Sequence, residues 1–190
     1  MLHKTNKMYM KYLLLSLLML CCATSISAQT DSLCNECEEG VKPFNLGLEF
    51  SVSPRSKGYT PILISPEIKI PVKRIQFSAG YQYMLVPFNA NKQKTFYTSH
   101  GLFAAAAYRL FCNGNGRKYW LLGKKESGYL KFKYARNVGK TDFAYDMYDL
   151  GLFEESNIFG SIKLGIGVRY IDSRSVGIKD FCSVFFSVGL

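Results

Sequence analysis

The sequence predicts an all-β protein, an antiparallel up-and-down β-barrel of eight strands. The clearest evidence is the stretch 157–170, NIFGSIKLGIGVRY, in which apolar residues alternate with serine, lysine, glycine and arginine. This two-residue period is typical of a strand, whereas a helix repeats every 3.6 residues. Similar segments recur along the chain and are separated by short turn-forming stretches. Strands that follow one another as hairpins lose their exposed edges when the sheet closes into a barrel.

The first 28 of the 190 residues have the composition of a secretory signal peptide. Three lysines precede an apolar core at 12–23, and Ser27 with Ala28 forms a small-residue cleavage site. The apolar core is shorter than the roughly 20 residues of a spanning helix, which argues against an uncleaved anchor. Residues 29–43 follow as a polar N-terminal tether. The remaining residues, 44–190, are expected to form one β-barrel domain.

The first half of this domain predicts four strands, at 44–53, 59–72, 75–86 and 96–112. The second is the least regular, because Pro61, Pro66 and Pro71 each remove a ladder donor. Lys73 and Arg74 form a tight turn into the third strand, and residues 87–94 are interpreted as a polar loop.

The second half predicts four more strands, at 130–138, 142–147, 157–170 and 178–190. In the short sixth strand, Phe143, Tyr145 and Met147 oppose Asp142 and Asp146. Residues 153–156 are interpreted as the turn that follows it. The Asn-Gly-Asn-Gly tract at 113–116 is a strong turn signal. The connection at 113–128 is long enough to hide another hairpin, so ten strands remain an alternative.

Periodicity separates two faces without saying which one points inward. The polar face holds many glycines together with charges of both signs, which can pair across a narrow lumen, and aromatic residues lie near strand ends as interfacial girdles require. These features favour a transmembrane barrel with its apolar face in lipid. A soluble barrel with an apolar lumen is the alternative. The expected interior polar network consists of Glu49, Glu67, Lys69, Arg109, Lys131, Lys133, Asp146, Lys163 and Arg169.

The sequence combines a leader, alternating segments and a terminal strand VFFSVGL at 184–190. In this combination it resembles the small outer-membrane β-barrel proteins of Gram-negative bacteria, of the OmpA-domain and OmpX type. This resemblance implies an outer-membrane location and an eight-stranded transmembrane barrel. It also implies that the barrel-insertion machinery reads the last strand during assembly. In that family the last residue is usually aromatic, whereas here it is Leu190.

The interior of an eight-stranded barrel is just wide enough to be filled by side chains. The expected interior charges could line a small porin-like conduit, or they could satisfy one another and plug the lumen. The plugged lumen is the interpretation we favour.

The loops at one end of the predicted barrel are basic. They are expected to contact lipid and the phosphates of lipopolysaccharide, although ordinary solvated loop charge explains them equally well. The residues concerned are Arg55, Lys57, Lys92, Lys94, Lys140 and Arg174. The bases of the chain form no continuous stripe, so its formal charge of +10 does not favour nucleic-acid binding.

Cysteine and histidine offer few reactive constellations. Cys34, Cys37 and Cys112 are candidates for a disulfide, with Cys112 bonding to either of the other two, as an oxidising exterior favours. Ser99 and His100 are neighbours, so a strand places them on opposite faces, where they cannot act as nucleophile and base. One histidine after cleavage and one CxxC are too few ligands for a closed zinc site. We therefore expect no catalytic residue, metal or cofactor.

The sequence predicts a non-enzymatic integral outer-membrane β-barrel with a structural, lipid-contacting or accessory role in the envelope. Two alternatives stay open: a soluble exported barrel that binds an apolar ligand, and a barrel enzyme that modifies envelope lipids.

Overall fold

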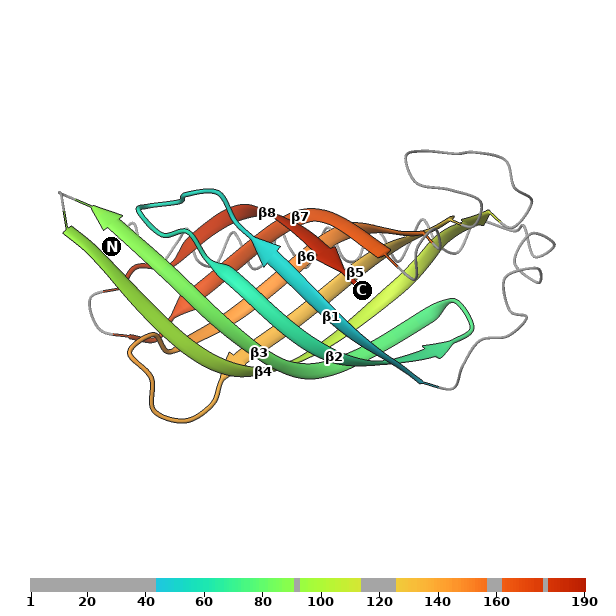
Figure 1. Ribbon diagram of the computed structural model, residues 1–190, viewed down its shortest axis with the longest axis horizontal. Coiled ribbons are helices and arrows are strands. Elements are labelled where there is room, and N and C mark those ends of the chain that lie inside the picture. The colour runs from blue at the N-terminus through green and yellow to red at the C-terminus, as the bar shows by residue number, and fades with distance from the viewer. Residues whose placement is uncertain (1–43, 91–92, 114–125, 157–161, 176–177) are drawn as a thin grey trace, which may run out of the picture. The chain divides into compact units, whose positions relative to one another are not determined.

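The computed structural model describes residues 44–90, 93–113, 126–156, 162–175 and 178–190, and these form eight β-strands (Figure 1). None of the described residues belongs to a helix long and apolar enough to cross a membrane. The expected signal peptide and tether lie outside the described residues. The strands are β1 (Asn45–Val52), β2 (Ile62–Val72), β3 (Ile75–Ala90), β4 (Gln93–Asn113), β5 (Glu126–Asn137), β6 (Tyr145–Ser156), β7 (Ile162–Ser173) and β8 (Phe181–Gly189).

Each strand pairs antiparallel with the next, and β8 pairs with β1 to close the barrel. At the closure Glu49 to Val52 face Gly189 to Phe186. The ladder continues to Leu190, whose backbone nitrogen donates to the Leu48 carbonyl at 2.9 Å. The described strands therefore form a closed eight-stranded barrel, which confirms the predicted fold class. The order of the strands needs no extra hairpin.

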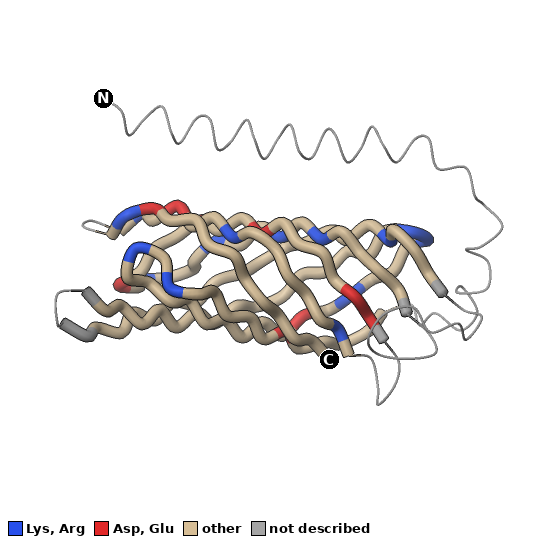
Figure 2. The backbone as a smooth tube through the Cα atoms, turned by 90° about the horizontal axis from the view of Figure 1, so that it is seen from above, with Lys and Arg blue, Asp and Glu red and all other residues tan. Residues whose placement is uncertain are grey.

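The apolar face points outward and the charged face inward. On β7 and β8, Leu164, Phe186 and Val188 are 37%, 48% and 49% exposed. The intervening Lys163 and Arg169 are 9% and 0% exposed. Figure 2 shows that charged residues interrupt the strands along the barrel as well as lying near its ends. These two strands thus have the opposite arrangement from those of a water-soluble barrel, with apolar side chains outside and charged side chains inside.

Two predicted connections are in fact parts of strands. Residues 87–94 were expected to be a polar loop, but β3 and β4 pair as far as Ala90 opposite Gln93. Residues 153–156 were expected to be a turn, but β6 continues to Ser156 opposite Ile162. Both errors arise because hydrogen bonds of the backbone hold a ladder together even where the apolar alternation has ended.

Prolines in β2 have a local effect only. Ser65 and Pro66 of β2 have no partner in the ladder with β3. Pairing resumes in the same register where Glu67 faces Gly80. A proline lacks the N–H that a ladder needs, so this interruption is the expected cost. Ser65 and Pro66 still pair with β1, whose ladder with β2 runs from Ile62 to Lys69, and the last three residues of β2 pair with β3.

We use two names for the ends of the barrel. The loop end carries the connections between β1 and β2, β3 and β4, β5 and β6, and β7 and β8. The terminal end carries the other connections, the start of β1 and the end of β8.

Candidate functional site

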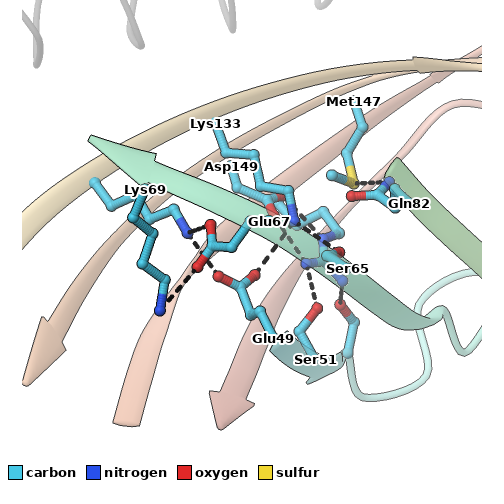
Figure 3. Close-up of polar contacts among 12 residues, drawn as sticks. Glu49, Ser51, Ser65, Glu67, Lys69, Gln82, Lys133, Met147 and Asp149 are labelled. Atoms are coloured by element: carbon cyan, nitrogen blue, oxygen red, sulfur yellow. Dashed lines mark hydrogen bonds and ion pairs between the residues drawn. The ribbon is translucent and has the colours of Figure 1, made fainter. Parts of the chain in front are cut away.

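The centre of the barrel holds a buried ion-pair network built on Glu49 of β1. Lys131 of β5 approaches Glu49 with its Nζ 2.6 Å from Oε2 and also lies 3.4 Å from Glu67 Oε2. Lys133, two residues further along the same face of β5, lies 3.2 Å from the other Glu49 oxygen. These lysines reach across the lumen, because β1 and β5 lie on opposite sides of the barrel. Figure 3 shows Lys133 among the polar side chains around Glu49.

Further contacts complete this network. Lys133 donates to the hydroxyl of Ser65 at 3.1 Å, and its Nζ lies 4.3 Å from the centroid of the Phe103 ring. Lys69 pairs with Glu67 at 3.4 Å. Every one of the charged groups is buried. A charge buried in a barrel is tolerated only when it is paired and hydrogen-bonded, and this network provides both.

A second buried group centres on Arg169 of β7. Its guanidinium makes two hydrogen bonds to the carboxylate of Asp149 on β6, each 2.8 Å long. The remaining donors reach Ser51 of β1 and Ser53 just after it, at 2.8 Å and 3.2 Å. The guanidinium also lies 4.8 Å from the centroid of the Phe185 ring. The fork geometry of arginine allows this one side chain to tie three strands together.

At the terminal end, Lys163 forms a third polar group. Its Nζ lies 3.3 Å from Glu155 Oε2 and donates to Gln76 Oε1 at 2.7 Å. The same ammonium lies 5.2 Å from the centroid of the Tyr129 ring. Arg109, opposite Tyr129 in the ladder, is half-buried on the inward face.

The interior near the loop end is apolar instead. Tyr59, from the connection between β1 and β2, stacks on Phe181 at 5.0 Å and on Phe88 at 4.7 Å. Gln82 donates to the hydroxyl of Tyr145 at 2.9 Å. The other buried members of this apolar cluster are Leu63, Met84, Val86, Phe103, Ala105, Ala135, Phe143, Met147 and Ile171. The lumen is thus filled by an apolar cluster at one level and by ion pairs at another.

Seven of the nine residues predicted for the interior network lie together in these groups: Glu49, Glu67, Lys69, Lys131, Lys133, Lys163 and Arg169. Arg109 shares their inward face. The prediction for Asp146 is wrong. Its carboxylate lies on the outward parity of β6, where it meets Arg174 at 3.2 Å and Arg136 at 3.6 Å.

The physical reason is that β6 enters the apolar cluster. Tyr145 and Met147 are fully buried there and face inward, so the polar residues between them face outward. The same misassignment hid Asp149, the carboxylate that pairs with Arg169. Asp149 has the same parity as Tyr145 and Met147, which the sequence shows. The predicted sixth strand, however, ended at Met147, two residues before Asp149, whereas β6 continues to Ser156.

The basic residues predicted at the rim lie at the loop end. Arg55 and Lys57 are exposed and donate to the carbonyl oxygens of Asn89 and Asp180, respectively. Lys140 is exposed, and Arg174 donates to the Tyr145 carbonyl at 3.0 Å. Lys92 and the side chain of Lys94 lie outside the described residues. Contact with lipopolysaccharide stays a prediction.

Ser99 and His100 lie on opposite faces of β4, as the alternation predicts. Ser99 is fully buried in the lumen, whereas His100 is exposed on the outer wall and hydrogen-bonds through Nδ1 to the Tyr81 hydroxyl. The two side chains therefore do not meet as nucleophile and base.

Cys112 is disulfide-bonded, but Cys34 and Cys37 lie outside the described residues, so the predicted pairing itself stays a prediction. Cys182 is a free, half-buried thiol. In the part of the chain that the structure describes, no three His, Cys, Asp or Glu side chains gather as metal ligands.

Comparison of the chain with family models, with curated proteins and with solved structures found no match.

Proposed function

We propose that this protein is a non-enzymatic integral β-barrel of the outer membrane of a Gram-negative bacterium, with a structural, lipid-contacting or accessory role in the envelope. The observation that carries the proposal is the orientation of the two faces. A closed barrel that buries ion pairs inside and exposes rows of large apolar side chains outside is suited to a solvent of acyl chains.

The outer wall of β5 to β8 is layered, and two complete rows of it are apolar. In one row Leu130, Leu152, Ile166 and Phe186 are successive register partners. The next row towards the loop end consists of Phe132, Leu150, Val168 and Val184. Soluble monomers rarely expose continuous apolar patches larger than a few hundred Å², so continuous apolar rows on the outer wall favour a lipid surrounding.

A row of tyrosines borders these apolar rows on the side of the loop end. Tyr134, Tyr148 and Tyr170 are register partners on three adjacent strands. Ring centroids of Tyr134 and Tyr148 are 5.3 Å apart, and the Tyr134 hydroxyl donates to Asp146 at 2.9 Å. Tyrosine favours the boundary between acyl chains and headgroups, because its ring is apolar and its hydroxyl is polar.

The spacing of charges on β6 fits a membrane. Asp146 and Glu154 both have the outward parity and delimit the apolar part of this strand. Eight strand residues span about 27 Å, and a tilt of 35–45° reduces this to about 20 Å along the barrel axis. That height is close to the apolar band of about 25 Å on outer-membrane barrels.

A lumen filled by side chains supports a sealed barrel rather than a ligand carrier or a conduit. Lys131 and Lys133 bridge the lumen to Glu49, and the apolar cluster fills the level above them. An apolar ligand would have to displace either these ion pairs or the cluster. The alternative of a soluble ligand-binding barrel therefore has no specific observation in its favour.

The proposal is tested by expressing the full chain in a Gram-negative host and fractionating the envelope. We expect the protein in the outer-membrane fraction, resistant to extraction with alkaline carbonate. On a denaturing gel it should migrate differently before and after heating, as folded barrels do. Recovery of a folded monomer from the periplasm without detergent would refute the proposal.

A further inference from the structure

Arg136 of β5 and His100 of β4 lie on the outer wall just beyond the tyrosine row. Arg136 faces Leu102 in the ladder, and His100 is two residues from Leu102 towards the loop end. Diagonal neighbours of this kind are about 7–8 Å apart. The Arg136 side chain is 58% exposed, and His100 is exposed as well. Both side chains are therefore accessible from outside the barrel, with His100 one row nearer the loop end than Arg136.

Asp146 holds the Arg136 guanidinium on one side only. The carboxylate lies 3.6 Å from Arg136 Nε and 3.2 Å from Arg174 Nε, and it also accepts the Tyr134 hydroxyl. Arg136 and Arg174 therefore share one carboxylate. Further round the wall, Asp172 faces Asp146 across β6 and β7 and would repel an anion there. An anion is therefore directed to the β4 side of Arg136, where His100 lies.

His100 is held in place by two tyrosines. Its Nδ1 hydrogen-bonds to the Tyr81 hydroxyl, and its ring centroid lies 5.8 Å from that of Tyr81 and 5.3 Å from that of Tyr83. With Tyr81 as the donor, the ring proton resides on Nε2, which then becomes a hydrogen-bond donor itself. Arg136 and His100 thus present donors on adjacent strands.

We propose that Arg136 and His100 bind a phosphate group of a lipid in the leaflet at the loop end. The inference rests on the proposed function, which puts the tyrosine row at the boundary of the acyl chains and the next row at headgroup height. A guanidinium matches two phosphate oxygens with its fork of donors, and the imidazole adds a third hydrogen bond. The bound lipid would lay its acyl chains along the apolar rows below the site.

The test uses the full-length protein, matured and folded in neutral detergent micelles and titrated with fluorescently labelled lipid A. Arg136→Gln and His100→Gln remove the two donors. Lys179→Gln is the matched control, because it removes one exposed positive charge from the connection between β7 and β8 at the same end of the barrel. Each variant is first shown to fold by heat-modifiable migration. Parallel titrations use dephosphorylated lipid A with the same acyl chains, and inorganic phosphate as a competitor.

We expect Arg136→Gln to weaken lipid A binding roughly tenfold and His100→Gln roughly threefold, as loss of charge-assisted hydrogen bonds predicts. Lys179→Gln should change it less than about twofold, and dephosphorylated lipid A should not distinguish the variants. Equal effects of Arg136→Gln and Lys179→Gln would overturn the inference while leaving the membrane barrel intact. Competition by inorganic phosphate at the affinity of the lipid would reassign the site to the free ion. A barrel that folds only without detergent would remove both proposals.

Discussion

Arg169 shows how a single side chain can organise a barrel interior. It is fully buried, and its donors reach Asp149 on β6, Ser51 on β1 and Ser53 just after β1. Asp149 faces Arg169 in the ladder, whereas β8 separates β7 from β1, so the contacts with the serines link segments that the ladder does not pair directly. A buried charge of this kind stabilises the fold only while its partners are present.

Replacing Arg169 by methionine should therefore destabilise the barrel by about 3–5 kcal/mol, because Asp149 is left as an unpaired buried charge. The double variant Arg169→Met with Asp149→Leu should recover most of that loss. Urea unfolding in lipid vesicles measures both values. Arg55→Met, which removes an exposed guanidinium, is the control and should change little. A single variant as stable as the control would show that the pair does not hold the strands.

Individual residues were predictable where the alternation was unbroken. Glu49, Lys131, Lys163 and Arg169 each lie between apolar neighbours of opposite parity, and each faces inward as predicted. Asp146 was misassigned, since the rule that polar residues face inward fails where the lumen is apolar. The carboxylates that Lys131 meets could not be predicted at all, because its contacts with Glu49 and Glu67 join residues more than sixty positions apart.

Within the elements, β7 illustrates how closely the interior is packed. On its inward face, Gly165 and Gly167 lie between Lys163 and Arg169. A Cβ at Gly167 would lie within 3.0 Å of the Leu150 carbonyl oxygen, the Gly151 Cα and the Phe185 ring. Two of these atoms belong to the backbone of β6 and cannot move away without disturbing the ladder. Glycine is required here by close approach and not by an unusual backbone angle.

Gly167→Ala should therefore destabilise the barrel by about 1–3 kcal/mol, the usual cost of overpacking. Gly189→Ala is the matched control on β8. A Cβ there would meet its nearest atom, Lys163 Cβ, at 3.4 Å, which is an ordinary contact. The control should change the free energy of unfolding by no more than about 0.5 kcal/mol. Equal losses in the two variants would contradict the packing described for β7.

Strand centres were predictable and strand ends were not. The period of two located all eight strands, including β2 with its prolines. The ends of β3 and β6 were placed too early and the start of β4 too late, because residues such as Thr95 or Glu155 carry no apolar signal although their backbones still pair. Ladder pairing between neighbouring strands therefore decided the boundaries, and no single strand contains that information.

For the whole molecule, the proposed function depends on what surrounds the outer wall. If acyl chains do, the cost of a charge depends on its depth. Ile166 lies in an apolar row of the wall, whereas Phe96 is 66% exposed on the part of β4 that extends beyond β5 at the loop end. Both side chains are large, apolar and outward-facing, so they form a matched pair.

Ile166→Arg should destabilise the barrel in vesicles by about 2–4 kcal/mol, and Phe96→Arg by about 0–1 kcal/mol. The difference arises because only the first charge must be desolvated by lipid. Refolding and unfolding titrations in vesicles measure both. Equal stability of the two variants would indicate that water surrounds both positions.

The most direct measurement is the environment of a nitroxide spin label on the outer wall in lipid vesicles. Labels are placed at Val168→Cys and, for comparison, at Phe96→Cys, in a background where the free Cys182 is replaced by serine. We expect the label at 168 to be relaxed mainly by molecular oxygen, which dissolves in acyl chains, and the label at 96 mainly by a water-soluble nickel chelate. Strong relaxation of the label at 168 by the nickel chelate would contradict the account, because that wall would then face water.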